Sequence, residues 1–315
     1  MAKIVFMGTP EFALPSLKGL MSRYELAAVV TQPDRPAGRR RQLRQSPVKQ
    51  LALAAGIPVF QPARLRRPAA VETLRRFDAD VFVVVAFGQI LPQSVLDLPR
   101  FGTINVHASL LPRWRGAAPI QAAIRAGDAE SGVTIMLLDA GLDTGPLLAR
   151  QAIELSNDET GSSLHDKLSQ MGAELLLRTL PKHLSGERAP RAQDDSQATV
   201  APQISKLEGE IDWAEPAEAI DRHVRAFTPW PGTYTVWKGE ELKIVAGRAG
   251  GGMAAPGRVV ETGGTVAIGT GAGLYLPSEL QLPGKKRLNV TDFVNGHRDF
   301  VGAQLGDRRG RRPSS

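Results

Sequence analysis

The sequence contains no cysteine, so neither disulfide bonds nor thiol catalysis is available to it. Its five histidines form no HExxH or similar cluster, so we assign no metal to the chain. No run approaches the roughly 18 uninterrupted apolar residues of a membrane-spanning helix. The first ten residues also lack the long apolar region of a secretory signal. These absences leave a cytoplasmic enzyme, with no membrane partner, as the simplest class.

Length and composition set the expected domain count. The chain has 315 residues, of which 42% are hydrophobic and 23% charged, as in a soluble globular protein. A chain of this length is too long for one comfortable hydrophobic core. We therefore expect two domains.

The first half of the chain alternates strand and helix patterns. Strands are expected at residues 3–7, 25–31, 57–60, 81–86, 101–107 and 133–138, and helices at 10–21, 47–55, 69–77 and 117–126. The continuous apolar run at 81–86 is typical of a parallel strand that is covered on both faces. The alternation predicts a doubly wound, mostly parallel α/β sheet. The Gly8-Thr9-Pro10 turn is not a GxGxxG dinucleotide fingerprint.

The pattern changes in the second half. Leucines at helical spacing over residues 164–180 close a first domain, which we place at 1–188. Residues 189–206 are polar and contain proline, which indicates a linker. A helix at 212–227 and short strands at 233–237, 242–246, 257–261, 265–269 and 273–276 predict a small, OB-like β-barrel at 207–304. The remaining 305–315 form an Arg-rich tail that we expect to be disordered.

The most informative residues are Asn105, His107 and Asp143. The first two lie in INVHASLLPRWRG, residues 104–116, and the third in DAGLDTG, residues 139–145. In a strand, Asn105 and His107 project on the same face, at the end where open α/β sheets bind ligands. An amide and an imidazole can stabilise an oxyanion while a carboxylate handles protons, so the trio predicts an acyl-transfer site. Each residue alone also fits a structural role in a strand end or turn.

Positive charge is clustered along the sequence. The net charge is +7, and Arg35, Arg39, Arg40, Arg41 and Arg44 crowd one loop after a predicted buried strand. That position puts the loop at the same sheet edge as the trio. The charge predicts a polyanionic partner, although a solvated surface loop would have the same composition.

These motifs resemble those of the methionyl-tRNA formyltransferase family, whose members formylate initiator methionyl-tRNA with 10-formyltetrahydrofolate. The resemblance covers about the first 300 residues and runs through FMGTPEFA (6–13), SPVK (46–49), residues 104–145, PWP (229–231) and GKK (284–286). The Asn-x-His and Leu-Asp-Thr-Gly motifs mark folate-dependent formyltransferases generally. The basic loop and the added barrel narrow the resemblance to the tRNA enzymes.

The resemblance implies a role for each motif. Asn105 and His107 would hold the formyl oxygen as it becomes an oxyanion, and Asp143 would pair with His107 and relay the proton. The folate site would be lined by Phe87, Gly88, Ile90, Leu91, Ser109, Leu110, Leu111, Pro112 and Asp139. The tRNA would meet Arg35, Arg39, Arg40, Arg41, Arg44, Lys285 and Lys286. Phe87 stands where family members often carry tyrosine. We expect a monomer.

Two other functions fit parts of the sequence. Formyl transfer to a small amine would explain the trio but neither the arginine loop nor the barrel. A non-catalytic RNA-binding protein would explain the loop and barrel but leave the trio with a structural role.

Overall fold

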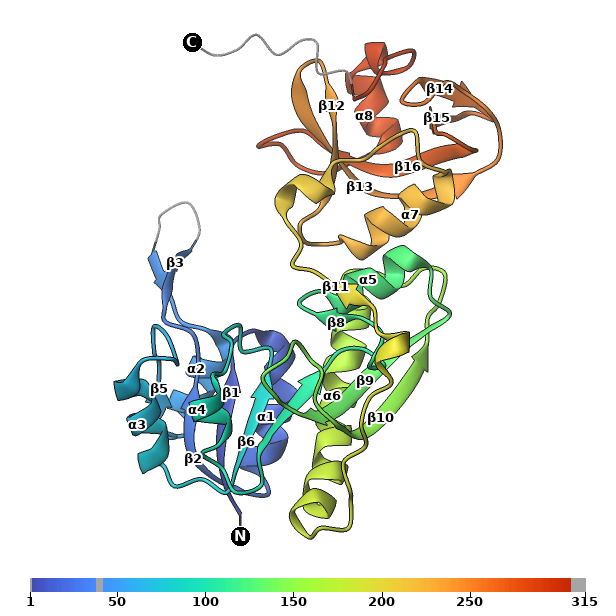
Figure 1. Cartoon of the computed structure of the whole chain (residues 1–315). Helices are drawn as coiled ribbons and strands as arrows, with labels where there is room; N and C mark the ends of the chain where they lie inside the picture. Colours follow the sequence, from blue (N-terminus) through green and yellow to red (C-terminus); the bar gives the residue numbers. More distant parts are fainter. Residues whose placement is uncertain (1, 38–41, 307–315) are drawn as a thin grey trace. The chain divides into compact units, whose positions relative to one another are not determined.

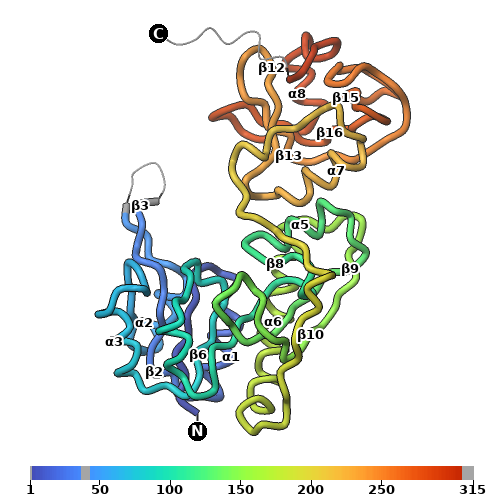
Figure 2. The backbone as a smooth tube through the Cα atoms, viewed as in Figure 1, coloured from blue at the N-terminus to red at the C-terminus, as the bar shows by residue number. Residues whose placement is uncertain are grey.

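The computed structural model describes residues 2–37 and 42–306 and divides the chain into two compact units (Figures 1 and 2). The first comprises Met1–Pro119, Glu130–Glu154 and His165–Ala201, and the second Ile120–Ala129, Leu155–Leu164 and Pro202–Ser315. This division differs from the predicted bounds in two respects. Ile120–Ala129 and Leu155–Leu164, which lie inside the predicted first domain at 1–188, belong to the second unit. Much of the stretch predicted as a linker, up to Ala201, belongs to the first unit because its backbone pairs there.

The first unit is built on a seven-stranded sheet. Its strands are β1 (Lys3–Gly8), β2 (Glu25–Val30), β5 (Val59–Phe60), β6 (Val81–Val85), β7 (Thr103–His107), β9 (Glu130–Leu137) and β10 (Leu147–Glu154), in the order β10-β9-β7-β6-β1-β2-β5. The pairs among β5, β2, β1, β6 and β7 are parallel, while β7–β9 and β9–β10 are antiparallel. The chain order reverses between β1 and β6, which is the switch point where such sheets bind ligands. The predicted doubly wound, mostly parallel sheet is confirmed.

Helices pack on both faces of this sheet. They are α1 (Leu14–Met21), α2 (Pro47–Ala54), α3 (Pro68–Arg76), α4 (Gln93–Leu96) and α6 (Gly161–Leu184). On one face, Val71 of α3 and Val95 of α4 share a buried cluster with Val5 of β1. On the other, α6 approaches β7 and β9 so closely that a Cβ at Gly172 would lie 2.8 Å from Val106. Ser46 caps α2 by accepting from the Lys49 amide at 3.1 Å, as the sequence predicts.

The arginine segment is not an open loop at its base. β3 (Arg35–Ala37) and β4 (Gln42–Arg44) form an antiparallel ladder in which Arg35 lies opposite Arg44. Beneath it, Lys49 pairs with Asp34 at 2.6 Å and Gln61 donates to the same carboxylate at 2.8 Å. These two contacts, with the Lys49 hydrogen bond as the larger cause, hold the pKa of Asp34 below its usual value. The ladder therefore rises from a base that is fixed by polar contacts.

The second unit contains an antiparallel sheet of six strands. They are β12 (Thr233–Trp237), β13 (Glu240–Gly250), β14 (Val259–Thr262), β15 (Thr265–Gly269), β16 (Leu274–Gln281) and β17 (Leu288–Asn289), in the path β12-β13-β16-β15-β14 with β17 beside β16. The helices α7 (Ala217–Ala226) and α8 (Val290–Gly296) accompany this sheet. The helix expected at 212–227 begins later because Pro216 occupies the position before its first turn.

The last described residues close this sheet into a barrel. Gly306 donates to the Val236 carbonyl of β12 at 2.9 Å. On its other side, the same segment bonds the start of β14, with the Val259 amide donating to Ala303 at 2.9 Å and the Leu305 amide to Gly257 at 2.8 Å. Leu305 is 3% exposed and belongs to the hydrophobic core of the unit. The barrel is therefore closed by residues 302–306, and the predicted tail cannot begin at 305.

Candidate active site

The end of β7 presents two polar side chains on one face. Asn105 and His107 alternate with the buried Ile104 and Val106, and they lie on the face where α3 and α4 pack. Asn105 is 9% exposed and His107 is 6% exposed. The strand alternation thus directs both groups to one point, as the sequence predicts.

Asp143 completes the trio from the loop between β9 and β10. Its Oδ1 accepts from Asn105 Nδ2 at 3.4 Å, and its Oδ2 lies 3.6 Å from His107 Nδ1. The Gly116 amide also donates to Oδ2, at 2.9 Å. The three predicted catalytic residues therefore meet around one carboxylate, whose side chain is 13% exposed.

A backbone carbonyl fixes the protonation pattern of the imidazole. His107 Nε2 lies 2.9 Å from the carbonyl oxygen of Trp114. Because a carbonyl only accepts, Nε2 must carry a proton. The site-facing Nδ1 then donates a hydrogen bond only when the ring is protonated, and accepts one when it is neutral.

Two loops that carry these groups have unusual backbone conformations. Asp143 has φ +52° and Trp114 has φ +61°, both in the left-handed region. At Gly116, φ is +115° and a Cβ would lie 2.6 Å from the Ala201 carbonyl oxygen, so only glycine fits there. Left-handed backbone at non-glycine residues costs about 1–3 kcal/mol and persists only where neighbouring contacts hold it.

The predicted folate residues divide by exposure. Phe87, Leu91, Ser109, Leu111 and Pro112 are buried, whereas Gly88, Ile90 and Asp139 are exposed and Leu110 is half-buried. Ser109 Oγ donates to the Arg113 carbonyl at 2.6 Å, and Asp139 Oδ1 accepts from Thr144 Oγ1 at 2.7 Å. The first contact lies within the loop that follows β7, and the second within the loop between β9 and β10. Ile90, 91% exposed after the carboxyl end of β6, is the accessible large apolar side chain of this group.

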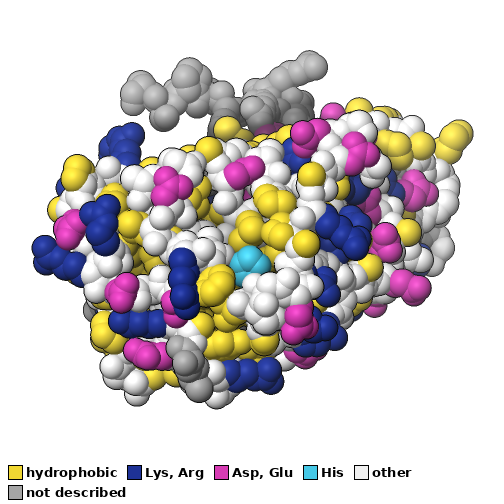
Figure 3. Space-filling model, turned by 60° about the horizontal axis from the view of Figure 1, so that its bottom comes forward, with side chains coloured by type: hydrophobic (Ala, Val, Ile, Leu, Met, Phe, Trp, Pro, Cys, Tyr) yellow, Lys and Arg dark blue, Asp and Glu magenta, His cyan; other side chains and the backbone are white. Residues whose placement is uncertain are grey.

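The predicted tRNA residues fall in two exposed places. Arg35 and Arg44 lie on the β3–β4 ladder of the first unit, and Lys285 and Lys286 in the turn before β17 of the second. Arg39, Arg40 and Arg41 lie outside the described residues. On the face shown in Figure 3, Lys and Arg side chains alternate with Asp and Glu, so the net charge is not gathered into one continuous patch there.

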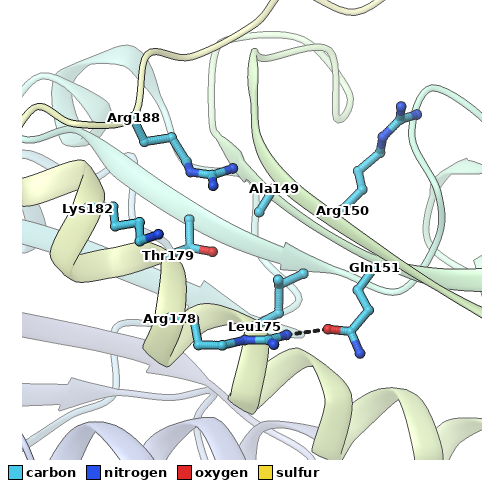
Figure 4. Close-up of a pocket in the computed structure, with 8 residues that line it drawn as sticks. All are labelled: Ala149, Arg150, Gln151, Leu175, Arg178, Thr179, Lys182 and Arg188. Atoms are coloured by element: carbon cyan, nitrogen blue, oxygen red, sulfur yellow. Dashed lines mark hydrogen bonds between the residues drawn. The ribbon is translucent and has the colours of Figure 1, made fainter.

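A separate basic cavity lies on the opposite face of the sheet. It measures about 320 Å³ between β10 and α6 and is lined by Arg150, Arg178, Lys182 and Arg188 (Figure 4). Arg178 donates to Gln151, and Arg188 donates to the Leu148 carbonyl at 2.7 Å. The packing of α6 against Val106 separates this cavity from Asn105 and His107, which point the other way.

Metal chemistry has no obvious ligand set in the described chain. Within residues 2–37 and 42–306, no group of three or more His, Asp or Glu side chains is placed to hold a metal ion. Of the helices in these ranges, none is long and apolar enough to cross a membrane.

Comparison with known families agrees with this architecture. The family model described as formyl transferase matches residues 2–180, and the one described as formyl transferase, C-terminal domain, matches residues 203–298. The chain therefore belongs to the formyl transferase family.

Relatives within this family are close. The chain is 52% identical to the methionyl-tRNA formyltransferase of Stutzerimonas stutzeri, over 94% of this chain and 95% of that protein. It is 48% identical to the methionyl-tRNA formyltransferase of Geobacter sulfurreducens, over 97% of each.

Solved structures share the fold at lower identity. The N-formyltransferase of Helicobacter canadensis, in complex with folinic acid and dTDP-3-aminofucose, is 17% identical with a TM-score of 0.68, covering 88% of this chain and 98% of that one. HypX of Aquifex aeolicus, in complex with tetrahydrofolic acid, is also 17% identical, with a TM-score of 0.65. The match covers 95% of this chain but only 48% of HypX.

Proposed function

We propose that this protein transfers the formyl group of 10-formyltetrahydrofolate to the α-amine of methionyl-initiator tRNA. The observation that carries the proposal is the meeting of Asn105 and His107 around Asp143, in a chain that aligns over nearly its whole length with methionyl-tRNA formyltransferases. Those relatives share both domains, so the similarity is not confined to the formyl-transferring half.

The reaction requires one bond to form and one to break at the formyl carbon. The amine nitrogen bonds to that carbon, and the formyl oxygen becomes an oxyanion. Collapse of this intermediate breaks the bond to N10 of tetrahydrofolate. The amine loses one proton and N10 gains one, so a single carboxylate that accepts and then returns a proton balances the reaction. Asp143 is the group placed to do this.

Asn105 and His107 stabilise the oxyanion from the end of β7. Both are nearly buried, and a donor held in such a site stabilises developing charge more strongly than it would in water. Since Trp114 occupies Nε2 of His107, the imidazole reaches the formyl oxygen through Nδ1. It therefore acts as an imidazolium in this step.

Folate binding is assigned to the switch-point edge of the sheet. The segment that follows β6 is tied to the segment after β1, because Thr9 Oγ1 donates to the Phe87 carbonyl at 2.9 Å. Gly88 and Ile90 remain exposed there and offer backbone groups and apolar area for a flat pterin. Phe87 and Leu91 anchor this segment in a buried cluster of the first unit.

The tRNA is assigned to the arginine segment and to the exposed turn of the barrel unit. Like charges directly opposite each other on a ladder are destabilising, yet Arg35 faces Arg44. A phosphate between them would relieve this repulsion, and the planar guanidinium binds phosphate bidentately. The base formed by Asp34, Lys49 and Gln61 would then orient the whole segment. Lys285 and Lys286 add positive charge in the second unit.

A transfer assay tests this function directly. The protein is incubated with 10-formyltetrahydrofolate labelled in its formyl group and with methionyl-initiator tRNA, methionyl-elongator tRNA or an amino-sugar nucleotide. We expect label in the initiator aminoacyl-tRNA alone, and its loss in Asp143→Asn. Label in the sugar nucleotide without label in methionyl-tRNA would replace the proposal with small-amine formylation. Binding of tRNA with no formyl transfer at all would leave an RNA-binding protein.

A further inference from the structure

One polar side chain beyond the predicted trio joins the two catalytic loops. Gln193 Nε2 donates to the carbonyl oxygen of Asp143 at 2.8 Å and to that of Gly145 at 2.7 Å. Its Oε1 accepts from Nε and Nη2 of Arg115, at 3.1 and 2.8 Å. The amide thus uses both of its hydrogens and both lone pairs of its oxygen, which is its full hydrogen-bonding capacity.

The segment around Gln193 is bound to the first unit along its length. We name residues 191–201 the strap. At its start, Arg191 exchanges backbone hydrogen bonds with Leu147 at 2.7 and 2.9 Å. Towards its end, Thr199 accepts from the Trp114 amide through Oγ1 and from the Arg115 amide through its carbonyl, both at 2.9 Å. The strap closes with β11 (Val200–Ala201), which pairs with β8 (Arg115–Gly116).

Arg115 bonds the strap through both its side chain and its backbone. The guanidinium donates to Gln193, and the amide donates to the Thr199 carbonyl. Its side chain is only 9% exposed, and its Nη2 also pairs with Asp195 of the strap at 2.6 Å. The next residue, Gly116, is the one whose amide bonds the Asp143 carboxylate. The strap therefore holds Asp143 from two sides. Gln193 bonds the carbonyl oxygen of Asp143. Thr199 and β11 bond the loop that carries Gly116, whose amide donates to the Asp143 carboxylate.

Asp143 needs such support. Its left-handed φ is a conformation that a non-glycine residue keeps only where neighbouring contacts hold it, and its loop contains the exposed Gly141 and Leu142. Its carboxylate sits at long distances of 3.4 and 3.6 Å from Asn105 and His107, so small backbone shifts would change both contacts. A displacement of about 1 Å in a reacting group can cost on the order of 10²-fold in rate.

We propose that Gln193 is a positioning residue for formyl transfer, which fixes the backbone of Asp143 so that its carboxylate faces Asn105 and His107. This inference rests on the proposed role of Asp143 as proton relay. Glutamine is required because two N–H donors must meet two carbonyl oxygens, where a glutamate would present only oxygen. Asparagine is one methylene shorter and cannot span the same groups.

The experiment compares three Gln193 variants with a control on the same strap. Gln193→Ala removes the side-chain amide. Gln193→Glu keeps the shape of the side chain but has no N–H donors. Gln193→Asn keeps the amide on a side chain that is one methylene shorter. Gln197→Ala is the control, because Gln197 is exposed and its amide donates to Asp194, another residue of the strap. Rates and KM values are measured for both substrates, together with the thermal midpoint of each variant.

We expect kcat to fall by on the order of 10–10² in Gln193→Ala and Gln193→Glu, with KM for methionyl-tRNA changed less than about threefold. Gln197→Ala should match the parent protein. The decisive measurement is the kcat of the double variant that combines Gln193→Ala with Asp143→Asn. If Gln193 acts through Asp143, the double variant should be no slower than Asp143→Asn alone, since coupled residues are not additive.

Each outcome is informative. A parent-like kcat in Gln193→Glu overturns the positioning role, as does a full additive loss in the double variant, which would indicate a general scaffold role. If Gln193→Ala fails to fold, the Asn and Glu variants carry the same comparison. A parent-like Asp143→Asn would instead overturn the proposed function, so the two failures are distinguishable.

Discussion

The Trp114 carbonyl accepts from Nε2 of His107, which leaves Nδ1 as the nitrogen with the proposed role in the reaction. An asparagine at position 107 places its amide near the former Nδ1, and a glutamine places it near the former Nε2. We predict that His107→Gln, which keeps the Trp114 hydrogen bond but removes the site-facing donor, lowers kcat by on the order of 10²–10³. For His107→Asn the decrease should be about tenfold smaller. Steady-state rates with saturating substrates provide the check, and the opposite order would mean that Nε2 faces the formyl oxygen during the reaction.

Variants of Asn105 and Asp143 test the two proposed roles, oxyanion stabilisation and proton transfer, separately. Asn105→Ala should lower kcat by on the order of 10²–10³, the usual cost of one oxyanion donor. Asp143→Asn keeps the shape of the side chain but cannot accept a proton, so kcat should fall by roughly 10²–10⁴. Folate affinity, measured by calorimetry, should change much less because these interactions strengthen in the transition state. A large decrease in folate affinity with little change in kcat would reassign both residues to binding.

Among residues, the meeting of Asn105, His107 and Asp143 at one point was predictable, and the contacts of Gln193 were not. Alternation along a strand is a local signal, and it correctly placed Asn105 and His107 on one face. Asp143 is predicted from its place in the DAGLDTG turn motif and from the chemistry of a carboxylate, and the structure brings it to the same point. Gln193 bonds groups 50 and 48 residues away in the sequence, and its polar surroundings are those of an ordinary linker. Only tertiary packing reveals such a residue.

Among elements, the parallel core of the sheet was predictable because its strands are continuously apolar. β10 was missed because it is an edge strand whose polar residues Arg150, Gln151 and Glu154 interrupt the pattern. The β3–β4 ladder was missed for a similar reason, since each strand has three residues and Pro36 lies in the first. A helix cap, in contrast, depends on neighbouring residues in the sequence, and the predicted cap of α2 at Ser46 is confirmed.

The β3–β4 element carries a prediction about salt. Arg35→Ala with Arg44→Ala should weaken use of methionyl-tRNA and reduce the slope of log K against log salt by roughly 0.7–0.9 for each phosphate that the protein no longer binds. Arg39, Arg40 and Arg41 changed together to alanine should reduce that slope by about two units. Folate binding serves as the control and should be unaffected. Normal tRNA use with an unchanged salt response would make the segment a solvated surface only.

At the scale of the whole molecule, a buried histidine makes the second unit sensitive to acid. Burial lowers the pKa of His223 to about 4, with the nearby Arg125 guanidinium acting in the same direction and the Glu208 backbone and carboxylate opposing it. The ring packs edge-on against Phe227 at 4.6 Å. Since the unfolded chain has the higher pKa, it binds the proton first, and stability present above about pH 6.5 is lost as the pH falls towards 4.

We predict a loss of about 2–3 kcal/mol in unfolding free energy between pH 7 and 4.5 from this group alone. His223→Phe keeps an aromatic ring against Phe227. Its unfolding free energy should therefore decrease by about 2–3 kcal/mol less than that of the parent protein over the same pH interval. Urea unfolding followed by tryptophan fluorescence is suited to this measurement, because three of the four tryptophans lie in the second unit. An identical pH dependence in the variant would assign the acid sensitivity to other groups.

The two-unit organisation was predictable in kind, because composition and periodicity change near the middle of the chain. The closure of the barrel was less predictable, because it depends on hydrogen bonds from residues 302–306 to both β12 and β14. The sequence around Leu305 shows glycine and charge and gives no strand pattern. Both edges of the sheet bond that segment, and Leu305 packs into the core of the unit.

The strap also determines where this chain can be cut or exchanged. A fragment that ends at residue 188, where helical periodicity suggests a boundary, would keep the trio but discard Gln193 and the partner strand of β8. A fragment that ends after Ala201 would keep both. A chimaera that takes its first part from this chain should therefore be joined after Ala201, so that the Asp143 loop retains Gln193.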